Sequence, residues 1–379
     1  MGQVRDRDDE SADGREVVEE TVRVAFFSPE PSNLKATWSF CVLPVELGRS
    51  HGIEGSVFSA PAPRLHDYIW RLWAKRRLPG RLAWGIYWYF IVLPFRILQV
   101  AGLGRFDVVF VQRSMFRMSS RPVFEWIASR IFGKPIVLHI DDALWIRFPR
   151  RPIEKRCQLA ELVVTGNSET ADVITSAGGQ VRKVHFGIEV ERYSARKHDE
   201  NRELVIGFTG TGGDVYLNEI SDPLSRALEE TGSRLAFIGG PGPPDLPALE
   251  RHLDWLPWND DAPTAFLETF DVAICPLIDD EWTRGKETFK IKEYMAAGLP
   301  QVLSPVGYGL EVIEDGVEGF FAETPDEWFE RLIRLIGDPD LRNEMGRAAR
   351  MRIETEFNVN QMIAGTAAVC REAAGKKGA

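Results

Sequence analysis

The sequence predicts an α/β fold built from two Rossmann-like, doubly wound domains. Short apolar runs rich in β-branched residues recur along the chain with helical segments between them. This alternation is typical of parallel strands that are buried on both faces. It stops once, at the polar run EVERYSARKHDENRE (189–203), and then restarts. We therefore expect a first domain over residues 21–195 and a second over residues 200–358.

The first domain is expected to contain five strands. They are VRVAFFS (22–28), FDVVFVQ (106–112), PIVLHI (135–140), AELVVTGN (160–167) and VRKVHFGI (181–188). A loop and a helix ending at a glycine follow the first strand, and RPVFEWIASRIFG (121–133) is typical of another helix. Residues 1–20 are highly charged and lack an apolar segment, so we expect a disordered lead without a secretory signal.

The second domain is expected to repeat this alternation. Its strands are LVIGFTG (204–210), RLAFIGG (234–240), DVAICPL (271–277), PQVLSP (300–305) and VEGFFA (317–322). Its helices include VYLNEISDPLSRALEE (215–230), KIKEYMAAG (290–298) and TPDEWFERLIRLIG (324–337). We expect residues 359–379 to form a helix that packs back toward the first domain. Ligands of such sheets bind at the carboxyl ends of strands, so the cleft between the domains is the expected site.

Charge is distributed unevenly along this acidic protein of net charge −10. Residues 64–156 hold eighteen Lys and Arg against six Asp and Glu, whereas residues 196–379 hold nineteen against thirty-four. A basic first half suggests an anionic partner such as a membrane surface, and a solvated basic face is the alternative. We expect no nucleic-acid partner, because no binding motif accompanies the charge. The four Cys are far apart, which favours a reducing, cytoplasmic location.

One apolar segment does not fit the strand and helix alternation. Residues 82–95 are uncharged, rich in Trp and Tyr, and follow the basic residues KRR. The segment is shorter than the roughly 20 residues that span a bilayer. We favour a buried core helix, while a membrane-interfacial helix or the wall of an apolar acceptor pocket would have the same composition. Peripheral contact with the inner face of a membrane through residues 64–105 is therefore an open expectation.

The turn IGFTGTGGDVYLNE (206–219) joins a strand to a helix. Its residues Gly210, Thr211, Gly212 and Gly213 would allow close approach of a phosphate to the backbone. A plain tight turn is the alternative. A nicotinamide dinucleotide site is not favoured, because the next strand ends in glycine where an acidic residue should meet the ribose.

The segment RGKETFKIKEYMAAG (284–298) collects cations and carboxylates at the start of a helix. Lys286, Lys290 and Glu293 fall on one helical face. Cations at a helix N-terminus oppose the dipole, and a bound anion would remove that conflict. Glu293 is placed to accept hydrogen bonds from sugar hydroxyls, whereas we expect Lys292 to be solvated. An exposed amphipathic helix is the alternative.

The segment HIDDALW (139–145) ends a strand with Asp141 and Asp142. Paired carboxylates at such a position suit a metal site, a catalytic base or a helix N-cap. The six His show no metal-ligand spacing, so we expect no metal. The motifs of nucleophile-elbow hydrolases, P-loop proteins and HExxH zinc proteases are absent.

With these residues in hand, the chain resembles the retaining GT-B-fold glycosyltransferases of family 4, the glycosyl transferases group 1. The likeness is strongest over 271–321, where EYMAAGLP, SPVGYGLEVI and DGVEGFF occur at the family's spacing. It implies that Glu293 binds ribose and that Gly307, Tyr308 and Gly309 lie near the nucleotide. It also implies that Lys286, Lys290 and the Gly210–Gly213 turn meet the diphosphate, and that Asp141 or Asp142 orients the acceptor.

Three positions depart from the family pattern. Gly285 stands where the first carboxylate of a paired-Glu motif is expected, Thr211 stands where an Arg is common, and Asp141 replaces a His. The resemblance implies a hexosyltransferase acting with retention on a sugar, lipid-linked or small-molecule acceptor, with a nucleotide-diphosphate sugar as co-substrate and no cofactor. Lys290, Asp141 and Asp142 are the expected catalytic residues. An epimerase or phosphorylase on the same fold, and a non-catalytic binding subunit, are the alternatives.

Overall fold

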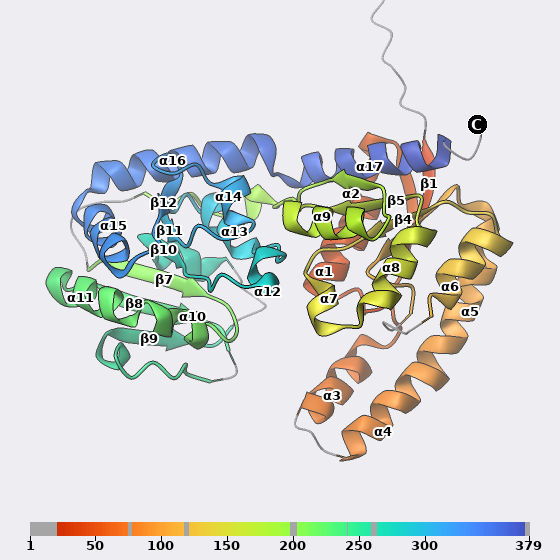
Figure 1. Ribbon diagram of the computed structural model, residues 1–379, viewed down its shortest axis with the longest axis horizontal. Helices are drawn as coiled ribbons and strands as arrows, with labels where there is room; N and C mark the ends of the chain where they lie inside the picture. Colours follow the sequence, from red (N-terminus) through yellow and green to blue (C-terminus); the bar gives the residue numbers. More distant parts are fainter. Residues whose placement is uncertain are drawn as a thin grey trace, which may run out of the picture.

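The computed structural model describes residues 21–74, 78–116, 121–197, 203–240, 242–258 and 264–375. The expected disordered lead at 1–20 therefore lies outside the described residues. The chain forms two α/β units side by side, each with one parallel sheet covered by helices (Figure 1).

The first domain contains a six-stranded sheet in the order β2-β1-β3-β4-β5-β6, and neighbouring strands pair in parallel. Its strands are β1 (Val22–Phe27), β2 (Ile53–Phe58), β3 (Val108–Gln112), β4 (Ile136–His139), β5 (Leu162–Thr165) and β6 (Val181–Lys183). The inner strands β3, β4 and β5 are fully buried, and all of their residues but the last of each strand are apolar. All five expected strands are confirmed, and β2 is an addition.

Helices of the first domain cover both faces of this sheet and extend one arm beyond it. Before β3 they are α1 (Lys35–Thr37), η1 (Trp38–Val42), α2 (Leu43–Leu47), η2 (Gly48–His51), α3 (Pro63–Ala74), α4 (Leu78–Ile86), η3 (Tyr87–Val92), α5 (Leu93–Ala101) and η4 (Leu103–Arg105). After β3 they are α6 (Val123–Trp126), η5 (Ile127–Ile131), α7 (Leu144–Arg147), α8 (Arg150–Leu159), α9 (Ser168–Ser176) and η6 (Val190–Arg192). Together α3, α4, η3 and α5 project from the sheet as a helical arm (Figure 1).

The second domain repeats the arrangement with the order β12-β11-β10-β7-β8-β9. Its strands are β7 (Val205–Thr209), β8 (Arg234–Ile238), β9 (Leu253–Leu256), β10 (Val272–Cys275), β11 (Gln301–Leu303) and β12 (Gly319–Phe321). Its helices are α10 (Asp214–Glu219), α11 (Ser221–Thr231), η7 (Glu250–His252), η8 (Ala265–Thr269), α12 (Glu281–Arg284), α13 (Phe289–Ala296), α14 (Gly309–Val312), α15 (Pro325–Gly337) and α16 (Pro339–Glu356). The five expected strands are again confirmed, with β9 added.

The last helix, α17 (Val359–Gly375), follows the second domain in sequence but packs on the first. It contacts α2, β1, β3 and β4, and Figure 1 shows α16 and α17 running along one edge of both domains. One apolar cluster joins Val24 and Phe110 of the first sheet to Ile363 of α17 and Ile291 of α13. The two domains therefore share a continuous core.

The segment at 82–95 is helical, as part of α4, η3 and α5, but the expectation of a buried core helix is wrong. Trp84, Tyr87 and Trp88 are buried against the domain, whereas Leu82 and Phe90 are 69% and 75% exposed. The helix is apolar on its outer face as well as on its inner face. An apolar composition therefore does not distinguish it from a helix that is buried all round.

Candidate functional site

The turn after β7 has its shape fixed by glycine. Gly210 and Gly212 adopt φ angles of +139° and +66°, which residues with a Cβ rarely adopt. A Cβ on Gly213 would lie 2.1 Å from Cε1 of Phe208, so the ring beneath requires a glycine there. Thr211 and Gly212 are exposed at the tip of the turn. The backbone of this turn is therefore accessible from solvent.

Lys290, in the first turn of α13, lies against this turn. Its Nζ is 3.8 Å from the centroid of the Phe208 ring and would be 3.0 Å from a Cβ placed on Gly210. Among the residues that the structure describes, no carboxylate forms an ion pair with it. Burial lowers the pKa of Lys290 to about 8, and the neighbouring Lys286 ammonium adds to this effect. The structure thus brings together Lys290 and Gly210.

Glu293 lies one helical turn further along α13 and pairs with the first domain. Its Oε1 accepts from Nζ of Lys35 at 2.5 Å and from the hydroxyl of Tyr193 at 3.3 Å. Lys35 belongs to α1, so this ion pair bridges the two domains. A sugar hydroxyl that approached Glu293 would have to share or displace Lys35.

Lys286 lies between the two domains, near Asp142. The field of its ammonium acts on both Asp142 and Lys290. Burial raises the pKa of Asp142 to about 7, and the adjacent Asp141 carboxylate raises it further, while Arg113, Lys286 and Arg147 oppose the rise. Asp142 is therefore a half-buried carboxyl group that titrates near neutral pH, next to a lysine of the other domain.

Asp141 is held in a different way. Arg113 donates to its two carboxylate oxygens from Nε and Nη2, each at 2.6 Å, and Asp141 is only 1% exposed. Burial disfavours its charge, but Arg113 keeps the pKa of Asp141 below the usual value. Arg113 itself has a φ of +59°, an uncommon conformation for a residue with a side chain. Both oxygens of Asp141 are thus occupied, and Asp142 is the member of the pair with room for a ligand.

Sequence reasoning missed the buried neighbours Glu287 and Lys292. The expectation that Lys292 is solvated is wrong, because it is fully buried. Its Nζ donates to the carbonyl oxygen of Phe186 at 2.5 Å and lies 4.8 Å from the ring centroid of Tyr308. Glu287 accepts from the backbone N–H of Gly166 at 2.6 Å. Both contacts reach into the first domain.

Burial moves the pKa values of these two groups toward their neutral forms. It raises the pKa of Glu287 and lowers the pKa of Lys292, and each charge partly offsets the shift of the other. The helical period alone gave no signal for this pair, because their hydrogen-bond partners Phe186 and Gly166 belong to the other domain and lie more than a hundred positions away.

Gly285 packs directly against the first domain. A Cβ at this position would lie 2.8 Å from Cβ of Ala143 and 3.3 Å from the Trp145 ring. The indole Nε1 of Trp145 also donates to Glu281 at 2.7 Å, which fixes the ring at the interface. The space beside Gly285 is therefore filled by Ala143 and the Trp145 ring of the first domain.

The VGYG turn is also part of the domain interface. Gly307 has a φ of +56°, and a Cβ there would lie 2.8 Å from the carbonyl oxygen of Thr283. Tyr308 is fully buried, and its hydroxyl is 3.0 Å from Nδ1 of His185. Gly309 begins α14. Tyr308 is thus packed beneath the surface of the site and is not exposed to solvent.

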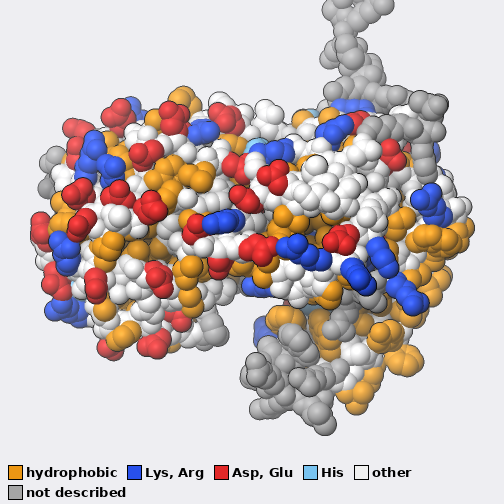
Figure 2. All heavy atoms as spheres, in the orientation of Figure 1, with side chains coloured by type: hydrophobic (Ala, Val, Ile, Leu, Met, Phe, Trp, Pro, Cys, Tyr) orange, Lys and Arg blue, Asp and Glu red, His pale blue; other side chains and the backbone are white. Residues whose placement is uncertain are grey.

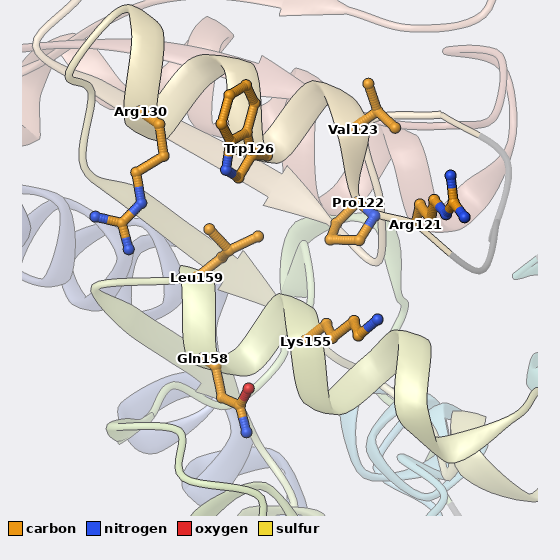
Figure 3. Close-up of a pocket in the computed structure, with 8 residues that line it drawn as sticks. All are labelled: Arg121, Pro122, Val123, Trp126, Arg130, Lys155, Gln158 and Leu159. Atoms are coloured by element: carbon orange, nitrogen blue, oxygen red, sulfur yellow. The ribbon is translucent and has the colours of Figure 1, made fainter.

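No group of three or more His, Cys, Asp or Glu side chains in the described part of the chain is placed to hold a metal ion. A separate cavity of about 480 Å³ lies on the first domain, between α6–η5 and α8 (Figure 3). Arg121, Arg130 and Lys155 line it together with Trp126. It contains none of the expected site residues.

A family model matches most of the second domain. Residues 205–338 match the family model for glycosyl transferases group 1. The match covers less than half of the chain, but it includes Gly210, Lys286, Lys290 and Glu293. Residues 205–338 are therefore similar to the glycosyl transferases group 1 domain.

Solved structures extend the likeness to both domains. Anabaena Alr3699/HepE in complex with UDP superimposes with a TM-score of 0.63 and 17% identity, covering 93% of this chain and 100% of that chain. The chain has the GT-B fold. Sucrose-phosphate synthase from Thermosynechococcus elongatus shares this fold with a TM-score of 0.63 and 13% identity over 93% of this chain and 99% of that chain.

Another solved structure with the GT-B fold is a glycosyltransferase from Rickettsia africae, with a TM-score of 0.66 and 11% identity over 93% of this chain and 98% of that chain. A curated relative is spore coat protein SA of Bacillus subtilis (strain 168), which is 25% identical over 232 residues. That match covers 52% of this chain and 60% of the relative, so it spans less than two thirds of the relative's length. The expected fold class is thus confirmed.

Proposed function

We propose that this protein is a glycosyltransferase that moves a hexosyl group from a nucleotide-diphosphate sugar to an acceptor hydroxyl with retention of anomeric configuration. The group 1 domain and the GT-B fold support sugar transfer. One observation links the proposal to particular residues. The ammonium of Lys290 lies against the Gly210 turn and has no carboxylate partner among the described residues.

The donor diphosphate would bind between this turn and Lys290. The leaving group of the reaction is a nucleoside diphosphate, so catalysis requires positive charge and N–H dipoles where phosphate charge develops. Lys290, the exposed backbone of the turn and Lys286 supply both kinds of group. The proposed site needs no cofactor and no metal ion.

Glu293 would bind the ribose of the donor. In this structure it holds Lys35 of the first domain, so the ribose hydroxyls would compete with Lys35 for the same oxygen. Donor binding would then loosen one link between the domains and tighten others around the ligand, as expected for an enzyme whose domains close over substrate.

Asp142 would orient the acceptor hydroxyl, and Asp141 would position that segment through Arg113. A carboxyl group with a pKa near 7 can accept a hydrogen bond from the hydroxyl and take up its proton as the bond to the sugar forms. The acceptor would attack from the face that the diphosphate leaves, so no protein nucleophile is required.

Two alternatives use the same fold. An epimerase would act on the nucleotide sugar without a separate sugar acceptor, and a phosphorylase would transfer a glycosyl group from a glycan to inorganic phosphate. A non-catalytic binding subunit is suggested by Gly285 and Thr211, because each replaces a group that the family commonly uses.

The test combines nucleotide binding with product analysis. Calorimetric titration with UDP and GDP should show binding. UDP is the first choice because the Anabaena neighbour was solved with UDP and with UDP-glucose. NMR of the products should then show transfer only when a sugar, lipid-linked or small-molecule acceptor is present, with the anomeric configuration of the donor. No binding of either nucleotide at millimolar concentration would overturn the proposal.

A further inference from the structure

The helical arm of the first domain exposes an unusually apolar surface. On α4, η3 and α5, Leu82, Phe90 and Leu98 are 69%, 75% and 71% exposed. The other exposed apolar side chains of the arm are Leu65, Tyr68, Trp70, Ile86, Tyr89, Phe95 and Ile97. A surface helix of a soluble domain normally presents a polar outer face, and contiguous exposed apolar surface marks an interaction site.

The outer face of residues 82–101 contains no charge at all. Arg96 is the only charged residue in this range, and it is 1% exposed. Its guanidinium points inward and donates to the carbonyl oxygens of Ser28 and Phe58, at 2.7 Å and 2.8 Å. The polarity of this helix is therefore the reverse of that of an ordinary surface helix, because its cation is buried and apolar residues form its exposed face.

Basic groups lie on the arm and on the neighbouring part of the first domain. Arg64 and Arg71 of α3 are exposed, and the sequence around it, residues 64–156, holds eighteen Lys and Arg against six Asp and Glu. Lys and Arg side chains lie over the α7–α8 part of the first domain, beside apolar side chains over α5 and α6 (Figure 2). The cavity between α6–η5 and α8 adds Arg130 and Lys155 next to the half-exposed ring of Trp126 (Figure 3).

We propose that the arm docks the protein on the surface of an anionic lipid bilayer. Apolar side chains with Trp and Tyr among them enter the boundary between headgroups and acyl chains, while the surrounding cations meet lipid phosphates. The uneven charge of the chain favours the same orientation on the bilayer. An anionic membrane surface attracts the basic first domain and repels the acidic second domain.

The arm lies on the bilayer and does not cross it. Residues 82–101 are long and apolar enough to span by length and composition, but a third of the window is buried within the protein. Trp84, Tyr87, Trp88 and Val92 form one apolar cluster with Ile69 of α3, and Arg96 ties the helix to the ends of β1 and β2. Crossing would require all of these contacts to break.

Vesicle binding by the full chain tests this inference. We expect sedimentation with vesicles of phosphatidylcholine containing about 30% phosphatidylglycerol, and at least tenfold weaker binding to phosphatidylcholine alone. The double variant Phe90→Glu, Leu98→Glu should lose at least tenfold in binding to the anionic vesicles. The double variant Arg130→Gln, Lys155→Gln should lose about tenfold and reduce the salt dependence.

Met351→Glu is the matched control, because Met351 is an exposed apolar residue of α16 on the second domain. It should bind vesicles as the wild type does. All variants should keep the wild-type thermal midpoint and UDP affinity. Loss of vesicle binding at unchanged UDP affinity would therefore concern the arm and not the proposed function. The inference does not depend on sugar transfer.

Three results would overturn the inference. One is a wild-type protein that binds neither kind of vesicle. Another is a Phe90→Glu, Leu98→Glu variant that binds anionic vesicles as well as the wild type. The third is a wild-type dimer in light scattering that this variant dissociates without any vesicle binding, which would assign the face to a second copy of the chain.

Discussion

At the scale of single residues, the lysines of the site differ in what holds them. Lys35 pairs with Glu293, and Lys292 is enclosed by Phe186 and Tyr308. Lys290 lies over an aromatic ring with no carboxylate partner in the described part of the chain. A desolvated cation without a counterion is costly to keep in a folded protein, so Lys290 is the lysine from which an anionic ligand would gain most.

We expect Lys290→Met to weaken UDP binding by about tenfold to a hundredfold, because a hydrogen bond to a charged phosphate contributes about 1.5–3 kcal/mol. The free energy of unfolding should stay the same or rise, since a buried charge is removed. Calorimetry and denaturant unfolding measure the two effects. Equal losses in affinity and stability would show a structural role instead.

The pH dependence provides the control for this prediction. Burial lowers the pKa of Lys290 to about 8, so the cation is present below pH 8 and is lost as the pH rises through that value. Wild-type UDP affinity should therefore fall between pH 7 and pH 9, after correction for nucleotide ionisation. In Lys290→Met the affinity should be low and flat over the same interval.

Asp142→Asn should lower kcat by about a hundredfold if Asp142 takes up the acceptor proton. Burial raises the pKa of Asp142 to about 7, so the carboxylate forms as the pH rises through 7, and wild-type kcat should rise over that interval. The variant should show a low, pH-independent kcat. The exposed Asp326 provides a control, because Asp326→Asn should leave the wild-type profile unchanged.

At the scale of elements, α13 both carries the expected donor residues and joins the domains. Its Lys290 and Glu293 face the expected donor site, while Lys292 penetrates the first domain. Any strain on this helix therefore affects the donor site and the interface together.

We expect Lys292→Met and Glu287→Gln each to destabilise the fold by about 1–3 kcal/mol, because each removes the neighbour of a buried ionisable group and leaves that group unsatisfied. The double variant should cost clearly less than the sum, as expected for electrostatically coupled neighbours. Chemical denaturation measures all three, with the exposed Lys197→Met as a control within about 0.5 kcal/mol of wild type. Strictly additive losses would contradict the coupling.

Gly285→Ala should destabilise by about 1–3 kcal/mol, because the new methyl group would overlap Ala143 of the other domain. Gly285→Glu, which restores the residue type that the family pattern expects, should cost more. Gly337→Ala is the matched control. No atom lies within 4 Å of a Cβ at Gly337, so alanine should be neutral or stabilise α15 by up to about 1 kcal/mol. A Gly285→Glu variant of wild-type stability would contradict the packing described for Trp145.

Prediction from sequence succeeded most clearly for the strands inside the two sheets. Eight of the ten expected strands lie there and are mostly apolar because both of their faces are buried, whereas β6 and β12 are edges. The two missed strands, β2 and β9, form edges of their sheets and are partly exposed, so Gly55 and Asp254 interrupt their apolar pattern. An apolar run that is interrupted in this way gives a weaker signal for a strand in the sequence.

The part of the candidate site with a local signal is the Gly210 turn and Lys290. Short motifs indicate both, and the two are adjacent in the structure. The buried state of Lys292, the Lys35 contact of Glu293 and the occupied oxygens of Asp141 depend on residues of the other domain or a distant strand. A helical period describes which residues share a face but not what covers that face.

At the scale of the whole molecule, α17 makes the two domains one folding unit. It follows the second domain in sequence yet buries Met362, Ile363 and Ala367 against the first. The same cluster continues into α13. The domains should therefore unfold together, and not as two independent units.

Ile363→Asp should lower the free energy of unfolding by more than about 4 kcal/mol, since it places an unpaired charge in the shared core. The midpoints seen by tryptophan fluorescence and by circular dichroism should fall together. Gln361→Asp, on the exposed side of the same helix, should change stability by less than about 0.5 kcal/mol. Separate transitions for the two domains would contradict a shared core.

The position of α17 also sets the order in which the protein can be completed during synthesis. The strands of the first domain leave the ribosome early, but the helix that covers part of their sheet is made only after the whole second domain. Domains usually fold as units in the order of their synthesis. Here the first domain emerges first, but part of its apolar face stays uncovered until α17 has been synthesised. The first domain therefore completes its folding last.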